Sequence, residues 1–133
     1  MIDVTLQNFE ADVLQASTRA PVLLDVWAEW CGPCKQLGPV LEQLEAEYAG
    51  RFTLAKLDAD KVPEIAGQLS QMLGTRSIPL CVMFVGGQPV DGFVGARPAG
   101  TIRQFLDMSN VISYPVGIDN HLKIINILIQ FLT

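Results

Sequence analysis

Hydrophobic positions along the chain change their spacing several times, and each change marks an element. Residues 21–28 (PVLLDVWA) form an almost uninterrupted apolar run of strand length, which is typical of a strand that is covered on both faces of a sheet. Residues 52–59 (FTLAKLDA) are expected to form a second central strand. After the first run, apolar residues recur at helical spacing from Pro33 to about Gly50, with Pro39 inside the pattern. We therefore expect a buried strand, an amphipathic helix and a second buried strand, in this order.

The rest of the pattern supplies the other strands and helices. Asn8 is a candidate N-cap for the first helix, and Gly74 is a stop for a later one. The dipeptide Gly86-Gly87 lies between two strand-like runs and indicates a hairpin turn. The expected elements are strands at residues 2–5, 79–85 and 88–94, and helices at residues 8–17, 62–73 and 99–109.

This order predicts an α/β protein with a central mixed sheet of about five strands and helices on both faces. Right-handed crossovers make the early strands parallel, and the hairpin adds an antiparallel edge. The domain is expected to span residues 1–109. Of the 23 charged residues in the chain, only Asp119 and Lys123 fall within residues 110–133. We expect this last segment to be an apolar tail of unassigned structure, with self-association as one hypothesis for its role.

Composition and charge narrow the classes of function. The 133 residues carry a net charge of -5, and no cluster of Lys and Arg marks a nucleic-acid surface. The N-terminus already contains Asp3, Glu10 and Asp12 and lacks the pattern of a signal peptide. No apolar run reaches the ~18 residues that suggest a membrane span. We expect a cytoplasmic protein whose partners include neither nucleic acid nor a membrane.

Two of the three cysteines, Cys31 and Cys34, stand three positions apart. They lie at the start of the expected helix, near Pro33. In a reducing compartment, such a pair is more often catalytic or metal-binding than structural. A zinc site would need Cys81 and His121 as further ligands, and no second close pair of ligands exists. A permanent structural disulfide across so short a loop constrains the unfolded chain little. Redox exchange is therefore the favoured interpretation.

The position of the pair at a helix start supplies its chemistry. The helix dipole and the free amide hydrogens favour a thiolate at Cys31. Cys34 lies about one turn on, so its sulfur can reach back to Cys31. Gly32 and Pro33 keep the rim narrow and uncharged, which lets a bulky substrate approach. We expect an exposed nucleophile with a resolving thiol beside it.

A resolving thiol needs a base nearby, and Asp25 is the candidate because it interrupts an apolar strand. Burial raises the pKa of a carboxyl, which suits Asp25 to exchange protons near neutrality. Lys56, in the middle of the next strand, is its expected partner. The alternative is a capping or edge carboxylate that is exposed to water.

Three segments that occur in the same order resemble the thioredoxin family. They are LLDVWAEWCGPCK (residues 23–35), RSIPLCVMF (76–84) and FVGARPAG (93–100). The resemblance covers about residues 2–109, and the combination is far more specific than a CxxC pair alone. It implies the thioredoxin fold and a protein disulfide reductase.

The resemblance also implies roles for single residues. Cys31 is then the attacking thiol, Cys34 the resolving thiol, and Asp25 the buried acid and base with Lys56 beside it. Pro79 is then a cis-proline that faces the cysteines and leaves the Ile78 backbone free to pair with an extended substrate. The implied apolar docking rim consists of Trp30, Gly32, Pro33, Ile78, Gly95 and Ala96.

Two further residues can each be interpreted in two ways. Trp27 either packs beneath the site or belongs to the core. Cys81 is either a buried small hydrophobe, which is the favoured view, or a regulatory or third redox thiol.

The expected partners are disulfide-containing proteins and a separate thioredoxin-type reductase, because the chain lacks a Gly-rich dinucleotide fingerprint. No cofactor and no metal are expected. Residues 4–17 and 86–96 look more like a subgroup in which the domain precedes tetratricopeptide repeats in a co-chaperone. The rival function is therefore a client-binding co-chaperone module with secondary redox activity. The intact Cys-Gly-Pro-Cys favours the enzyme, whereas the subgroup resemblance and the apolar tail favour the rival.

Overall fold

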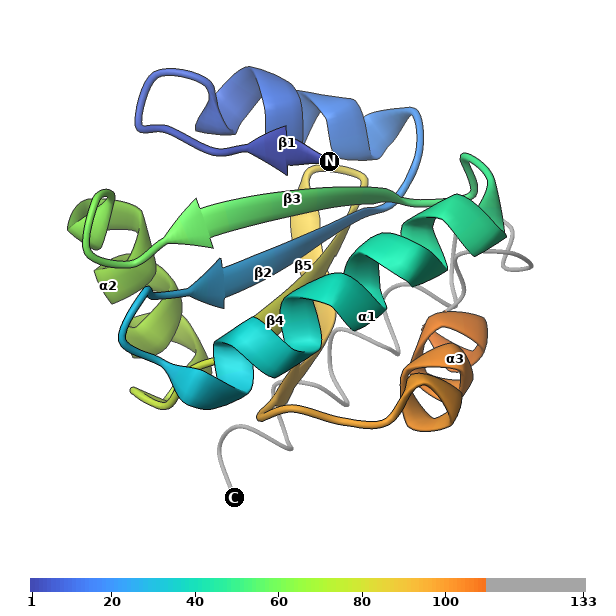
Figure 1. Cartoon of the computed structure of the whole chain (residues 1–133). Coiled ribbons are helices and arrows are strands. Elements are labelled where there is room, and N and C mark those ends of the chain that lie inside the picture. Colours follow the sequence, from blue (N-terminus) through green and yellow to red (C-terminus); the bar gives the residue numbers. More distant parts are fainter. Residues whose placement is uncertain (110–133) are drawn as a thin grey trace.

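The computed structural model describes residues 1–109, in which five strands form a single sheet (Figure 1). The strand order is β1-β3-β2-β4-β5, with β1, β3 and β2 parallel and both β4 and β5 antiparallel to their neighbours. This arrangement confirms the expected α/β class and the mixed sheet. The strands are β1 (Ile2–Asp3), β2 (Val22–Trp27), β3 (Thr53–Asp58), β4 (Leu80–Val85) and β5 (Gln88–Val94). The helices are η1 (Glu10–Gln15), η2 (Ala16–Thr18), α1 (Gly32–Tyr48), α2 (Pro63–Leu73) and α3 (Ala99–Met108).

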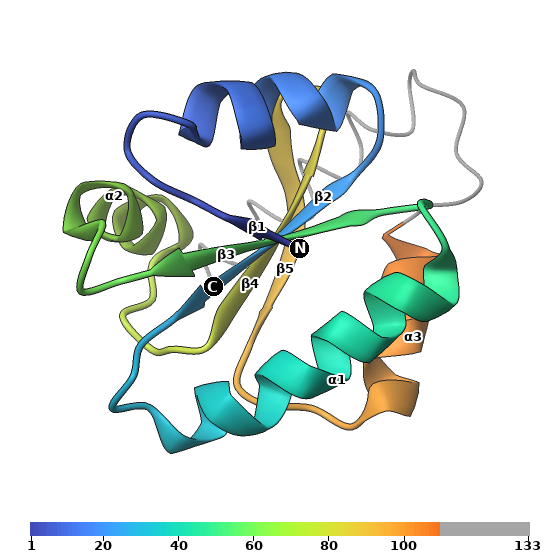
Figure 2. The ribbon, with the colours of Figure 1, turned by 45° about the horizontal axis from the view of Figure 1, so that its top comes forward.

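Helices cover both faces of the sheet, and each face has its own apolar cluster (Figure 2). Successive side chains of a strand point to opposite faces, so Leu23 packs with α1 and α3, whereas Leu24 packs with η1 and α2. The cluster on the α1 side includes Leu37, Leu41, Leu44, Leu54, Met83, Ile102 and Leu106. Both faces of β2 are therefore buried, as its apolar sequence predicted.

Glycines follow the ends of two of these elements, at the positions that the sequence predicted. Gly86 and Gly87 have φ of 64° and 82°, and the two-residue turn between β4 and β5 requires positive φ at both positions. Gly74 adopts the left-handed conformation just after α2. These two predictions are confirmed.

The first helix differs from its expectation. It consists of a π-helical segment, η1, followed by a short 3₁₀ segment, η2. Asn8 is not its N-cap: the Asn8 N–H donates to Thr5 Oγ1 at 3.1 Å, and the Thr5 N–H donates to Asn8 Oδ1 at 2.7 Å. This reciprocal pair has the form of a capping box and closes the turn before the helix. The N-cap position of η1 is Phe9, which makes no side-chain cap hydrogen bond, so the assignment of Asn8 as N-cap is wrong.

Residues 110–133, and with them the predicted tail and its self-association, lie outside the described residues. Within residues 1–109, none of the helices combines the length and the apolar character that crossing a membrane requires.

Candidate active site

Cys31 and Cys34 form a disulfide at the N-terminus of α1, with their Cα atoms 5.3 Å apart. Cys31 is the N-cap residue, and its Sγ accepts a hydrogen bond from the Cys34 N–H at 3.2 Å. Pro33 lies in the first turn, where a missing N–H costs nothing. The structure thus represents the oxidised form, and it shows the amide donor that the sequence predicted at the Cys31 sulfur.

The sulfurs are more covered than the sequence suggested. Cys31 is only 4% exposed and Cys34 only 3%, so the expectation of an exposed nucleophile is wrong for the oxidised form. The two sulfurs cover each other, and the pair packs with Trp27, Ala28 and Ile78. Trp27 therefore packs against the site itself. A substrate has to approach along the rim, where Gly32 and Pro33 are exposed.

A cis peptide bond joins Ile78 to Pro79, as the resemblance implied. The Ile78 carbonyl oxygen lies 3.9 Å from Cys31 Sγ, so this bond borders the disulfide. The Gly95 N–H donates to the Pro79 carbonyl at 2.9 Å, and Gly95 has a φ of 91°, which favours glycine. Within residues 1–109, neither the N–H nor the C=O of Ile78 has a backbone hydrogen-bond partner. An unpaired stretch of backbone therefore lies beside the disulfide.

Two other predicted rim residues, Trp30 and Ala96, are exposed. The Trp30 side chain is 70% exposed, and its indole N–H donates to Asp60 Oδ2 at 3.0 Å. Ala96 borders a shallow hollow beside Leu37 and Val40 of α1. Sequence reasoning missed Asp60, because thirty positions separate it from Trp30 and no local pattern links them.

Asp25 is fully buried on β2, which excludes the water-exposed alternative. It stands in register with Lys56 of β3 on one side and with Cys81 of β4 on the other. Burial raises the pKa of Asp25 to about 6, although the positive charge of Lys56 acts in the opposite direction. Cys81 Sγ lies 3.9 Å from Asp25 Oδ1, while Oδ2 has no hydrogen-bond partner among the described residues. The carboxyl therefore has the proton affinity that the proposed acid–base chemistry needs.

Lys56 is close to Asp25 without forming a direct ion pair with it. Its ammonium group lies 4.9 Å from the centre of the Trp27 ring, and a Cβ added to Gly38 would lie 3.3 Å from Nζ. Gly38 follows Cys34 by four residues, so both lie on the same face of α1, about one turn apart. The Lys56 ammonium is thus about one helical turn from Cys34. A glycine inside a helix was the available sign of this close approach, and the sequence interpretation did not use it.

In this arrangement, the candidate ligands of the zinc alternative either have other partners or lie outside the described residues. Cys31 and Cys34 are joined to each other, and Cys81 is buried next to Asp25. His121 lies outside the described residues. Within residues 1–109, no group of three or more His, Cys, Asp or Glu side chains is placed to hold a metal ion.

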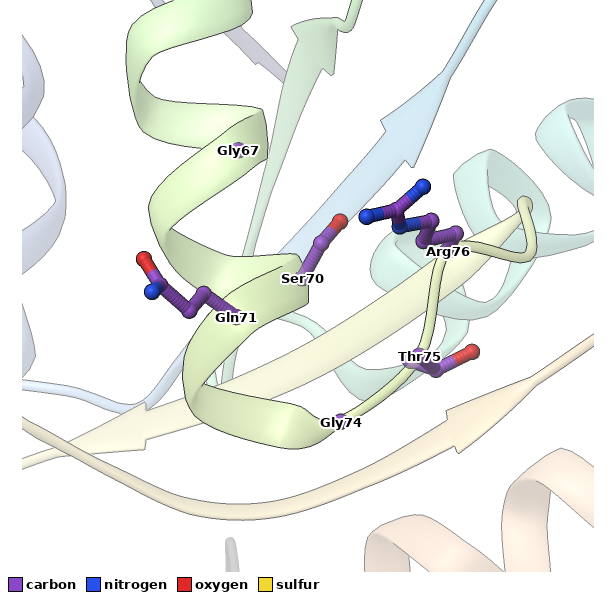
Figure 3. A pocket seen from close by; sticks show the side chains of 6 residues that line it. All are labelled: Gly67, Ser70, Gln71, Gly74, Thr75 and Arg76. Atoms are coloured by element: carbon purple, nitrogen blue, oxygen red, sulfur yellow. The ribbon is translucent and has the colours of Figure 1, made fainter.

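A second hollow lies at the C-terminal end of α2 (Figure 3). The side chains of Ser70 and Arg76 point toward each other across it, and Arg76 is the only charged residue in its lining. The lining consists of Gly67, Ser70, Gln71, Gly74, Thr75 and Arg76. None of the predicted site residues lines this hollow, so the candidate active site is the region around the Cys31–Cys34 disulfide.

The Cys31–Cys34 disulfide lies at the start of a helix, beside backbone groups that have no backbone partner. The thiolate of a dithiol can open such a disulfide by exchange, and the reduced pair can then attack another disulfide. This places the chain in the class of dithiol–disulfide oxidoreductases. The family model described as Thioredoxin matches residues 1–108. The chain therefore belongs to the thioredoxin family, and its fold is the thioredoxin fold.

Individual relatives agree with this family. Thioredoxin 2 of Chlorobaculum tepidum is 46% identical over 105 residues, which cover 79% of this chain and 91% of that protein. A thioredoxin of Mycobacterium bovis is 45% identical over 108 residues, covering 80% of this chain and 88% of that protein. A bifunctional thioredoxin reductase/thioredoxin of Mycobacterium leprae is 46% identical over 111 residues. That match covers 84% of this chain but only 22% of the bifunctional protein.

Proposed function

We propose that this oxidoreductase reduces disulfides of other proteins, with Cys31 as the attacking thiolate and Cys34 as the resolving thiol. The observation that carries the assignment is the Cys34 N–H, which points at Cys31 Sγ from the first turn of α1. A negative charge on that sulfur is stabilised by the amide and by the N-terminus of a 17-residue helix. Cys34 is inside the first turn and has no comparable cap position.

The reaction balances in two exchanges. In the reduced protein, the Cys31 thiolate attacks one sulfur of the substrate disulfide, forming a mixed disulfide and releasing one substrate thiolate. Cys34 then transfers its proton to the Asp25 carboxylate and attacks Cys31 Sγ. The Cys31–Cys34 disulfide forms, the second substrate thiolate leaves, and two electrons have passed to the substrate. Lys56, beside Asp25, stabilises the ionised carboxylate before the transfer.

The substrate is proposed to bind as an extended segment along Ile78. The unpaired N–H and C=O of Ile78 can pair with a substrate strand, in the manner of strand addition. Pro79 and Gly95 hold this segment through their hydrogen bond, and Gly32 and Pro33 leave the approach uncharged. Trp30 and Ala96 would extend the docking surface on the outer sides. These roles remain proposals for each residue.

Electrons are proposed to return from a separate thioredoxin-type reductase. The name of the Mycobacterium leprae relative joins a reductase and a thioredoxin in one protein, which supports such a pairing. The cytoplasmic location stays a prediction. Within residues 1–109, the Cys31–Cys34 disulfide and the match to the thioredoxin family support the oxidoreductase over the client-binding co-chaperone.

Trapping of the mixed disulfide tests the assignment of the two cysteines. We expect Cys34→Ser to accumulate a covalent adduct with a disulfide-containing peptide, because the resolving step is removed. Cys31→Ser should accumulate at least ~10-fold less adduct, since Cys34 lacks the cap position. Intact-mass spectrometry after acid quenching measures both.

The matched control is Cys31→Ser/Cys34→Ser, which keeps the buried Cys81. It should form no adduct. Adducts that form equally in Cys31→Ser and Cys34→Ser would contradict the division of roles.

Self-association through residues 110–133 is a separate proposal, which the low charge and apolar content of that segment support. By light scattering after gel filtration, we expect the full chain to have a mass above that of one copy and a chain ending at Ser109 to have the mass of one copy. Its rate of insulin reduction should stay within about twofold, because every proposed site residue lies between Asp25 and Ala96. A full chain with the mass of one copy, or the same number of copies in both chains, would count against this role.

A further inference from the structure

The thiol of Cys81 has no part in the exchange steps, yet it faces the carboxyl that does. Cys81 and Asp25 are partners across the antiparallel pair of β4 and β2, and both are fully buried. The Sγ–Oδ1 distance of 3.9 Å is within reach of a long S–H···O hydrogen bond. Among the described residues, this thiol is the only hydrogen-bond donor to the Asp25 side chain, because Oδ2 has none.

The groups around Asp25 leave few other means of stabilising its charge. β3 contributes Lys56, which attracts the carboxylate from outside hydrogen-bond range. On the α1 side, Gly38 lies against the Lys56 ammonium, and Cys34 is one helical turn away from Gly38. Arg97, beyond β5, acts electrostatically on Cys81. Within residues 1–109, the Cys81 thiol is thus the only group that donates a hydrogen bond to the Asp25 carboxylate.

We propose that Cys81 is a positioning residue: its S–H donates to the ionised Asp25 carboxylate and so limits how readily that carboxylate takes the Cys34 proton. The inference rests on the proposed function, in which Asp25 accepts that proton. It differs from both sequence interpretations, since a plain hydrophobe has no donor and a redox thiol needs access to a substrate. Cys81 has no access, because it is fully buried.

The Cys81 thiol keeps its proton in the neutral pH range, where Asp25 loses its own. Burial raises the pKa of Cys81 well above its usual range, and the neighbouring negative charge of Asp25 raises it further. A group that stays protonated beside a carboxyl donates to its ionised form and favours that form. Removing the donor should therefore make Asp25 hold its proton to a higher pH.

The test measures the Asp25 carboxyl directly, by a ¹³C NMR pH titration of the full-length oxidised chain. In that form Cys31 and Cys34 cannot titrate, so the curve isolates Asp25. We expect Cys81→Ala to shift the midpoint upward by ~0.5 pH unit or more, as the loss of a weak hydrogen bond to a charge implies. Cys81→Val, which fills the space without a donor, should shift it in the same direction and replaces the alanine variant if that one does not fold.

Two controls separate the hydrogen bond from changes in packing. Cys81→Ser keeps a donor, so its midpoint should stay at or below that of the native chain. Val82→Ala removes volume at the next position of β4, on the opposite face of the sheet, and should leave the midpoint unchanged.

The results distinguish this inference from the proposed function. An unchanged midpoint in both Cys81→Ala and Cys81→Val overturns the role of Cys81 and leaves the exchange chemistry standing. The proposed role of Asp25 fails by a different result, namely an unchanged rate of mixed-disulfide resolution in Asp25→Asn.

Discussion

Cys31→Ser is expected to abolish catalysis of insulin reduction, bringing the rate down to that of dithiothreitol alone. After that background is subtracted, the loss should be on the order of 10³-fold or more, because the variant removes the nucleophile itself. The amide of Cys34 and the helix N-terminus favour an anion at position 31, but the hydroxyl of serine stays protonated near neutral pH. The appearance of turbidity as the insulin chains separate gives the rate.

The control for this experiment is Ser70→Ala, in the polar hollow at the end of α2 (Figure 3). It removes a hydroxyl from a residue that is not among the proposed site residues, and its rate should match the native one within about twofold. Retention of more than a tenth of the native rate in Cys31→Ser would show that another thiol starts the reaction.

The features that sequence reasoning found are those that local pattern determines. The apolar run of β2 predicted a strand with two dry faces, and the single carboxyl within it stood out because a charge there is costly. The cysteine spacing and Pro33 placed the pair at a helix start. The cis bond before Pro79 followed from the family resemblance alone, since spacing says nothing about it.

The features that it missed depend on which strands are neighbours. Alternation along β4 predicts the face on which Cys81 lies, but its contact with Asp25 exists only because β4 pairs with β2 in one register. The cover over Cys31 likewise comes from Ile78, 47 positions away, which packs against the sulfurs. The cap of the first helix was misplaced for another reason: Asn8 is a residue type that favours caps, but here it forms reciprocal hydrogen bonds with Thr5 in the turn before η1.

Asp25→Asn should stabilise the oxidised chain at pH 8 and leave its stability nearly unchanged below pH 4. The pKa of Asp25 rises from 3.8 to about 6 on folding, mainly because burial disfavours the charge. Between these values the unfolded chain has lost the proton that the native chain keeps, so stability falls as the pH rises through this window. Above it, the native chain contains a buried charge that an asparagine amide lacks. A shift of about two pKa units corresponds to about 3 kcal/mol in the free energy of unfolding.

Urea denaturation at pH 3.5 and at pH 8 measures this difference in both chains. The gain of Asp25→Asn should grow through the window from about 4 to about 6 and then stay constant, because both states are fully ionised above it. Glu42→Gln, which removes an exposed carboxyl from α1, should change stability by less than ~0.5 kcal/mol at either pH. If Asp25→Asn gave no gain at pH 8, Lys56 and Cys81 would have to compensate the buried charge in full. The low-dielectric site that makes Asp25 a proton acceptor near neutrality would then be absent.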